Sequence, residues 1–300
     1  MEHRENLAKK ALKGTSIGDA FGESFFGETD IVLQHIQERT IPTTSWEFTD
    51  DTVMTIAIYQ QLIEHGTIDQ DQLVKQFITN LQKDPNRGYG ATVRRLLREV
   101  SEGQDWRVVA PNAFEGMGSM GNGAAMRVSS IGAFYFDDLA QVKQLAMQSA
   151  TVTHTHPEAI ASAIATALAT QIRTLSEKIS PQVFINKVVE ALPDTDTRAK
   201  MVKSLAIPYH YHPATIKTVL GNGHQMTAQD TVPFAIWCAA HNLQNFEEAL
   251  WKAVSVLGDR DTICAIVGGI VMMSTQEKYI PQAWYNSVED VDSSPFMKND

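Results

Sequence analysis

Residues 159–169 read Ala-Ile-Ala-Ser-Ala-Ile-Ala-Thr-Ala-Leu-Ala, within a longer segment, 157–175, that is small or apolar on every side. A helix that is apolar all round must be buried, because none of its faces suits contact with water. We therefore predict that this segment is a small-residue helix at the centre of an α-helical domain, closely surrounded by other helices.

The helical spacing of apolar residues continues along most of the chain. It is found at residues 7–15, 53–63, 73–81, 137–150, 181–192, 196–205, 212–220, 231–241, 246–256 and 262–274. Strand-like alternation is scarce, so the pattern predicts an all-α fold of about a dozen helices. Without a linker or a composition shift, we expect a single compact domain over residues 1–300. Loops are expected at 23–48, 84–90, 101–123, 193–195 and 275–285, and the two long ones are typical of functional segments.

The composition is that of an ordinary globular protein, with 300 residues, of which 43% are hydrophobic, and a net charge of −10. The negative charge argues against nucleic-acid or anionic-membrane binding. The longest apolar run, Ile263–Met273, is too short for a membrane span. Cys238 and Cys264 are predicted to be small core residues. Because Met1–Lys13 is charged and lacks the apolar core of a signal peptide, we expect a cytoplasmic protein, and we expect a monomer.

Two short acidic clusters, Thr49-Asp50-Asp51-Thr52 and Asp259-Arg260-Asp261-Thr262, each open an apolar helical pattern. Taken alone, each could be a helix N-cap, with Asp261 or Thr262 capping at the second site. However, carboxylate and hydroxyl oxygens are also the ligands that hard divalent cations prefer. Because the same donors occur at two helix starts, we predict that the clusters come together and hold one or two ions such as Mg²⁺ or Mn²⁺.

A third acidic element, Gly18–Glu23, follows a helical pattern, and its glycines favour a tight turn. Asp19 could cap a helix or accept a bond from a backbone amide near the site. Glu23 is a candidate general base, and Glu28 competes with it for that role.

A glycine-rich loop, Gly116–Arg127, enters a helix and could cradle phosphate oxygens with its backbone N–H groups. It is neither a Walker motif nor a Rossmann fingerprint. The triplet Gly121-Asn122-Gly123 recurs at 221–223, which we interpret as chance. Further on, His154 and His156 precede the central helix. One of them could contact a ligand, and the alternative is capping or core hydrogen bonding.

Together these elements resemble the ADP-ribosylglycohydrolase family over nearly the whole chain, about residues 7–275. The resemblance rests on five motifs in matching order: Gly18-Asp19-Ala20-Phe21-Gly22, Thr49-Asp50-Asp51-Thr52, Gly121-Asn122-Gly123-Ala124-Ala125-Met126-Arg127, Thr153-His154, and Gly258-Asp259-x-Asp261-Thr262. It implies the orthogonal multi-helix domain of that family and a binuclear metal site. The ligands of two Mg²⁺ or Mn²⁺ ions would be Thr49, Asp50, Asp51, Asp259, Asp261 and Thr262.

The resemblance also implies a substrate site. The glycine-rich loop would wrap the diphosphate and ribose of ADP-ribose, Phe114 would stack near the adenine, and His154 would lie beside the ligand. The loop residues concerned are Gly118, Ser119, Met120, Gly121 and Asn122.

The chain departs from the family pattern at two places. Arg260 stands where members often have threonine, and Phe26 stands where members often carry a glutamate. The second departure leaves the catalytic carboxylate to be assigned, and we favour Glu23, with Asp50 or Asp261 as metal-bound alternatives.

The implied reaction is hydrolysis of the bond between C1″ of ADP-ribose and an acceptor, through an oxocarbenium-like transition state. ADP-ribosylated arginine on protein is the preferred substrate. The alternatives are a serine-linked or small O-acetyl ADP-ribosyl compound, and a catalytically inactive, ADP-ribose-binding or crystallin-like relative. Release of free ADP-ribose distinguishes the enzyme from the inactive relative.

Overall fold

The computed structural model describes residues 1–43, 45–176 and 178–297, so residues 44, 177 and 298–300 of the predicted domain lie outside the described residues. Across the described ranges the chain forms sixteen α-helices and three 3₁₀-helices, which confirms the all-α prediction. They are α1 (Glu2–Glu23), α2 (Thr29–Glu38), α3 (Asp50–His65), α4 (Gln70–Lys83), α5 (Ala91–Ser101), α6 (Trp106–Val109), η1 (Asn122–Ala124), α7 (Ser129–Phe134), α8 (Leu139–Thr151), α9 (Pro157–Leu175), α10 (Pro181–Glu190), α11 (Asp196–Ser204), α12 (Pro213–Leu220), α13 (Ala228–His241), α14 (Phe246–Val254), α15 (Arg260–Val271), η2 (Met272–Ser274), η3 (Glu277–Tyr279) and α16 (Gln282–Ser287).

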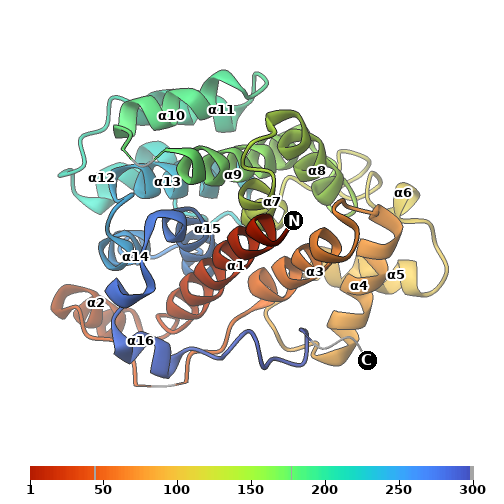
Figure 1. Cartoon of the computed structure of the whole chain (residues 1–300), viewed down its shortest axis with the longest axis horizontal. Coiled ribbons are helices and arrows are strands. Elements are labelled where there is room, and N and C mark those ends of the chain that lie inside the picture. The colour runs from red at the N-terminus through yellow and green to blue at the C-terminus, as the bar shows by residue number, and fades with distance from the viewer. Residues whose placement is uncertain (44, 177, 298–300) are drawn as a thin grey trace.

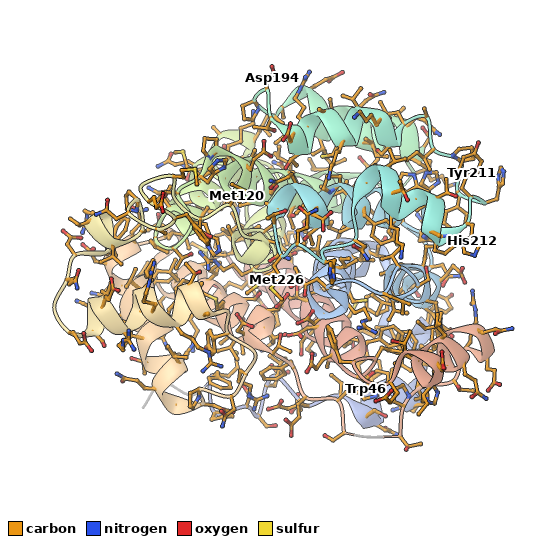
Figure 2. The ribbon with its side chains drawn as sticks, turned by 180° about the vertical axis from the view of Figure 1, so that it is seen from behind. Trp46, Met120, Asp194, Tyr211, His212 and Met226 are labelled. Carbon is orange, nitrogen blue, oxygen red and sulfur yellow. The ribbon has the colours of Figure 1, made fainter. Side chains whose placement is uncertain are left out.

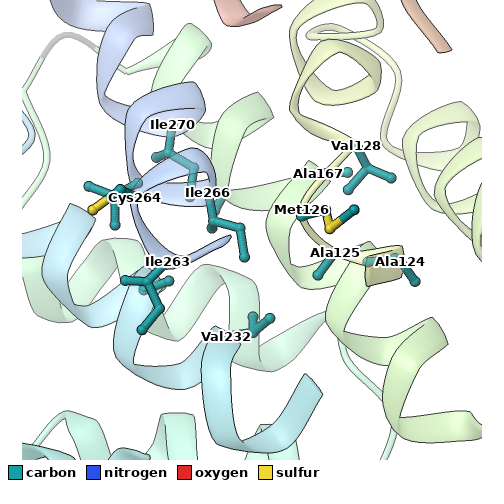
Figure 3. Packing of buried hydrophobic residues seen from close by; sticks show 14 of the residues in the cluster. Ala124, Ala125, Met126, Val128, Ala167, Val232, Ile263, Cys264, Ile266 and Ile270 are labelled. Carbon is teal, nitrogen blue, oxygen red and sulfur yellow. The ribbon is translucent and has the colours of Figure 1, made fainter. Parts of the chain in front are cut away.

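Helix α9 lies within the helical assembly, as its composition predicts. Its alternate alanines, Ala159, Ala161, Ala163, Ala165, Ala167 and Ala169, have no exposed surface. It packs against α7, α8, α10, α13 and α15 (Figure 1). Figure 3 shows Ala167 of α9 in the same apolar cluster as Ile266 and Ile270 of α15.

Helices α1 and α15 lie side by side through the middle of the molecule (Figure 1) and approach each other closely because glycines line the contact. A Cβ atom added at Gly18 would lie 2.7 Å from the carbonyl carbon of Cys264, and one at Gly22 would lie 2.5 Å from that of Arg260. Any larger side chain at these positions would push the two backbones apart. This contact fixes the C-terminal end of α1 against the N-terminal end of α15.

Several segments predicted as loops contain helices, so that prediction is wrong in part. Segment 23–48 contains α2, segment 101–123 contains α6, and segment 275–285 contains η3 and the start of α16. Helix α2 buries only Val32, and it leaves Ile31 and Leu33 exposed. A helix with so small a buried face gives almost no apolar periodicity, which explains why the pattern missed it.

Helix α13 begins at Ala228, three residues before the predicted start, and it contains Pro233. Proline has no N–H to donate to the carbonyl of Gln229 one turn earlier. Lys200 donates its Nζ to that carbonyl at 2.8 Å instead. The side chain from α11 therefore compensates the missing backbone bond, which lets the helix run through the proline.

Cys238 and Cys264 are buried and free, as predicted. Within the described residues, no helix combines the length and the apolar character needed to cross a membrane.

Candidate active site

The N-terminal ends of α3 and α15 meet, which brings the two acidic clusters together. Thr262 Oγ1 donates a long hydrogen bond to Asp51 Oδ2 at 3.5 Å, across 211 residues of sequence. On the α3 side, Thr49 Oγ1 lies 3.3 Å from the same carboxylate oxygen. The carboxylates therefore gather at the start of two helices whose dipoles favour negative charge there.

The capping alternative holds for only one of the two clusters. Thr49 is the N-cap of α3 and accepts a bond from the Asp51 N–H at 3.3 Å. The N-cap of α15 is Asp259, so the prediction that Asp261 or Thr262 caps this helix is wrong. Asp259 makes no side-chain capping bond, and its Oδ2 accepts instead from Asn122 Nδ2 at 2.5 Å. Its carboxylate is thus turned toward the glycine-rich loop.

Gly18–Glu23 belongs to the last turns of α1, so the predicted tight turn is wrong. The glycines serve the close approach to α15 described above. Asp19 accepts four hydrogen bonds from the start of α3: from the N–H and hydroxyl of Thr49, both at 2.9 Å, and from the N–H and hydroxyl of Thr52, at 3.0 and 2.5 Å. Burial raises the pKa of Asp19 to about 7, even though these bonds favour the ionised form. Asp19 therefore ties α1 to the acidic end of α3.

The electrostatics of the cluster favour a bound cation. Burial, together with the neighbouring carboxylates, raises the pKa values of Asp50, Asp51 and Asp259. The Oδ1 atoms of Asp51 and Asp261 are buried and have no hydrogen-bond partner within the described ranges. Among the described residues, no three Asp, Glu, His or Cys side chains already form a metal-binding group. The oxygen donors suit Mg²⁺ or Mn²⁺, and the unpartnered oxygens would need to turn toward such an ion.

The glycine-rich loop lies beside this cluster and turns through left-handed backbone conformations. Gly118 has φ +75°, and Phe114 has φ +52° with a side chain that is 52% exposed. Ser119 and Asn122 are buried, and Met120 and Gly121 are partly buried. Phe114 therefore stands at the surface just before the glycine-rich loop, in which Asn122 reaches Asp259.

A second loop, residues 221–227, supports the first, and the sequence analysis missed its role. Asn122 N–H donates to Met226 C=O at 3.2 Å, and Ala228 N–H donates to Met120 C=O at 2.8 Å. Figure 2 shows Met120 and Met226 near each other on the same side of the molecule. The recurring Gly-Asn-Gly triplet, which we interpreted as chance, lies in this loop.

The second triplet contacts one metal-ligand candidate, Asp259, directly. Asp259 N–H donates to Asn222 C=O at 3.0 Å, and a Cβ added at Gly223 would lie 2.5 Å from the Cβ of Asp259. Asn122 of the first triplet binds the carboxylate of the same residue. The two triplets thus hold Asp259 from both sides, and their repetition was the signal in the sequence.

The two histidines before α9 have different positions. His156 caps α9 by accepting the Glu158 N–H at 3.1 Å. His154 is 4% exposed, and its ring faces Gly121 and Gly123, where added Cβ atoms would lie 3.0 and 3.1 Å from the imidazole. The His154 ring therefore lies against the glycine-rich loop, whereas His156 meets the loop only through its backbone, whose N–H donates to Ser119 C=O at 3.3 Å.

Among the candidate bases, Glu23 lies nearer the cluster than Glu28. Partial burial and the charge of Asp261 raise the pKa of Glu23 to about 7, while Arg260 opposes the shift; the side chain remains open to water. Glu28 is the exposed N-cap of α2. The Arg260 guanidinium lies 4.3 Å from the centre of the Phe26 ring, and its Nη1 donates to Phe25 C=O at 2.8 Å. The two departures from the family pattern therefore contact each other.

The fold and site define an all-α protein in which a glycine-rich loop faces a buried cluster of carboxylates. The description of the family model that matches residues 1–297 is ADP-ribosylglycohydrolase. The chain belongs to the ADP-ribosylglycohydrolase family.

Curated relatives agree with this assignment over most of their length. The chain is 27% identical over 331 residues to ADP-ribosylhydrolase ARH3 of Homo sapiens, covering 95% of this chain and 90% of the relative. It is 26% identical over 288 residues to the ADP-ribosyl-[dinitrogen reductase] glycohydrolase of Rhodospirillum rubrum, and the match covers 93% of this chain and 89% of that relative. A solved structure described as an ADP-ribosylglycohydrolase-related protein complex shares the fold, with a TM-score of 0.63 at 20% identity, covering 96% of this chain and 94% of that one.

Proposed function

We propose that this protein is a divalent-metal-dependent hydrolase that cleaves the glycosidic bond between C1″ of ADP-ribose and an acceptor. The observation that carries the proposal is the junction of α3 and α15, where Thr262 meets Asp51 and the glycine-rich loop binds Asp259 through Asn122. This junction supports the proposal because carboxylate and hydroxyl oxygens, which could bind a cation, lie next to the glycine-rich loop, which could bind a diphosphate and ribose.

Two divalent cations, Mg²⁺ or Mn²⁺, would be held by the oxygens of Thr49, Asp50, Asp51, Asp259, Asp261 and Thr262. When bound, they would supply positive charge that orients the ribose hydroxyls and offsets the buried carboxylates. The family match and the unpartnered Oδ1 atoms of Asp51 and Asp261 support this part of the proposal.

The chain's own residues would bind the substrate and move the proton. The backbone of 118–122 would contact the diphosphate and ribose, with Phe114 near the adenine and His154 beside the ligand. A carboxylate takes a proton from the attacking water as the water oxygen bonds to C1″, and the acceptor leaves with the bonding electron pair and then gains a proton. We assign this role to Glu23, with Asp50 and Asp261 as alternatives, because its raised pKa suits proton transfer near neutral pH.

The preferred substrate is ADP-ribosylated arginine on protein. The protein itself is proposed to be a single-domain monomer that acts in the cytoplasm. A serine-linked or O-acetyl ADP-ribosyl compound is the alternative, and turnover of the three substrates side by side decides between them. Tight ADP-ribose binding with no release of ADP-ribose under any divalent ion would instead support the inactive, ligand-binding relative.

Substitution of Asp261 tests the metal dependence. Asp261→Asn should abolish Mg²⁺- or Mn²⁺-dependent release of ADP-ribose while preserving the helical circular dichroism signal. Asp194→Asn is the matched control, because its side chain is fully exposed on the surface that Figure 2 shows at the top. Full activity of Asp261→Asn would contradict the metal role.

A further inference from the structure

Arg127 is a buried cation that the proposed reaction does not use. It is 0% exposed, and its guanidinium lies 4.8 Å from the centre of the Phe77 ring. Its Nη2 donates to Ser149 C=O at 2.6 Å and to Thr153 Oγ1 at 2.8 Å. Arginine has only donors, so both bonds have one possible direction.

The bond from Arg127 determines how the Thr153 hydroxyl is used. Thr153 is 1% exposed, and its Oγ1 lies 2.7 Å from Nδ1 of His154. Since Oγ1 accepts from Arg127, its own hydrogen needs an acceptor, and Nδ1 is at hydrogen-bond distance. The reverse arrangement, with His154 Nδ1–H donating, would leave the Thr153 hydroxyl hydrogen buried without a partner, which is unfavourable. Full satisfaction of the network therefore places the imidazole proton on Nε2.

The Nε2 atom of His154 faces the glycine-rich loop. An added Cβ at Gly121 would lie 3.0 Å from Nε2, so the loop passes directly over this edge of the ring. His154 is 4% exposed, and the hydrogen bond that its ring makes within the described residues is the one at Nδ1. The Nε2 atom is not itself fully enclosed, so its N–H is left to bond to water or to a ligand held in the glycine-rich loop.

We propose that Arg127, acting through Thr153, holds His154 as the Nε2–H tautomer, which donates a hydrogen bond to an oxygen of the ADP-ribosyl ligand in the glycine-rich loop. Arg127 and Thr153 are positioning residues, and only His154 touches the ligand. The identity of the ligand rests on the proposed function, whereas the tautomer does not. Consistent with a neutral ring, burial and the charge of Arg127 lower the pKa of His154 to about 3.

The first test is nitrogen NMR on the full-length, ¹⁵N-histidine-labelled protein with Mg²⁺ present. His154 should show a protonated, pyrrole-type Nε2 and an unprotonated, pyridine-type Nδ1, and His154→Asn assigns the signals. A protonated Nδ1 would overturn the inference and leave the proposed function intact. Because this measurement needs no variant of Arg127 or Thr153, it determines the tautomer even if such variants fail to fold.

The second test is calorimetric titration of Thr153 variants with ADP-ribose. Thr153→Val keeps the side-chain shape but cannot orient the imidazole, so the affinity should fall about tenfold, as expected for loss of one buried hydrogen bond. Thr153→Ser keeps the hydroxyl, so its affinity for ADP-ribose should equal that of the wild type. Thr170→Val is the control, because the Thr170 hydroxyl is buried in α9 and bonds to the carbonyl of Thr166 in its own helix at 3.1 Å.

The outcomes separate the two proposals. Unchanged affinity in Thr153→Val, or an equal loss in Thr170→Val, would overturn the role of the hydroxyl. If wild-type protein shows the expected tautomer but binds no ADP-ribose with either ion, the positioning of His154 is supported and the proposed function is refuted.

Discussion

Substitution of Gly18 by alanine should destabilise the protein and damage the site together. The added Cβ would lie 2.7 Å from the carbonyl carbon of Cys264, whereas ordinary contacts begin at 3.4 Å. The carbonyl oxygen of Cys264 is closer still to the added Cβ. Both groups are backbone, so no side chain can rotate away, and α1 must retreat from α15 by about 1 Å or more. Overpacking of this kind costs about 3 kcal/mol, and the better helix propensity of alanine returns about 1 kcal/mol. We expect a net loss of about 2 kcal/mol in the free energy of unfolding.

Urea denaturation followed by circular dichroism measures this loss. Gly90→Ala is the control, because an added Cβ there meets nothing within 4 Å and the residue has ordinary negative φ. Gly18→Ala should also lower ADP-ribose release under conditions where the variant is folded, since Asp19, the next residue, holds the start of α3. Equal stability and activity of the two variants would refute the argument that glycines set the spacing of the site.

Three other perturbations address single side chains. Glu23→Gln should lower kcat for ADP-ribose release more than affinity for ADP-ribose; if Glu28→Gln does so instead, the assignment of the base is wrong. Arg260→Thr should lower the free energy of unfolding by about 1 kcal/mol and speed amide hydrogen exchange over residues 24–28, because it removes a hydrogen bond and the contact with Phe26. Unchanged hydrogen exchange in this variant would contradict that role of Arg260. His154 has a folded-state pKa of about 3 against about 6.5 in the unfolded chain, so the unfolded state binds more protons and stability falls as pH falls below about 6.5. Between pH 7 and 5 the free energy of unfolding of the wild type should therefore fall by about 2 kcal/mol more than that of His154→Asn. If urea denaturation shows the same pH dependence for both proteins, a buried neutral ring is excluded.

Local sequence patterns predicted the helices whose apolar residues are buried in a regular pattern. The alanine-rich segment is apolar on every side, so its place at the centre followed from composition alone. The exposed helix α2 carries no such pattern. The predicted helix at 231–241 already contained Pro233, but the bond that lets α13 run through this proline comes from Lys200 on another helix, which no local pattern reveals.

The structure confirms that the two acidic clusters come together, whereas the tight turn expected at Gly18–Glu23 is wrong. The donor chemistry of the acidic clusters indicated that they meet, and they do. Gly18 and Gly22 suggested a turn because glycine permits one, but a short side chain also permits close helix packing, and only the partner helix distinguishes the two uses. The contact between Phe26 and Arg260 joins residues far apart in sequence, which no local spacing could reveal.

The pairing of α1 with α15 has a consequence for synthesis on the ribosome. The glycine-lined face of α1 is translated long before its partner helix α15, which begins more than two hundred residues later in the sequence. Contacts between such distant segments form late, after a large loss of chain entropy. Until then the apolar face of α1 and the isolated acidic end of α3 remain exposed in the nascent chain, where chaperones would bind or aggregation would begin. Truncation before α15 should therefore yield an insoluble fragment, so the last helix of the site also sets the point at which the chain can complete its folding.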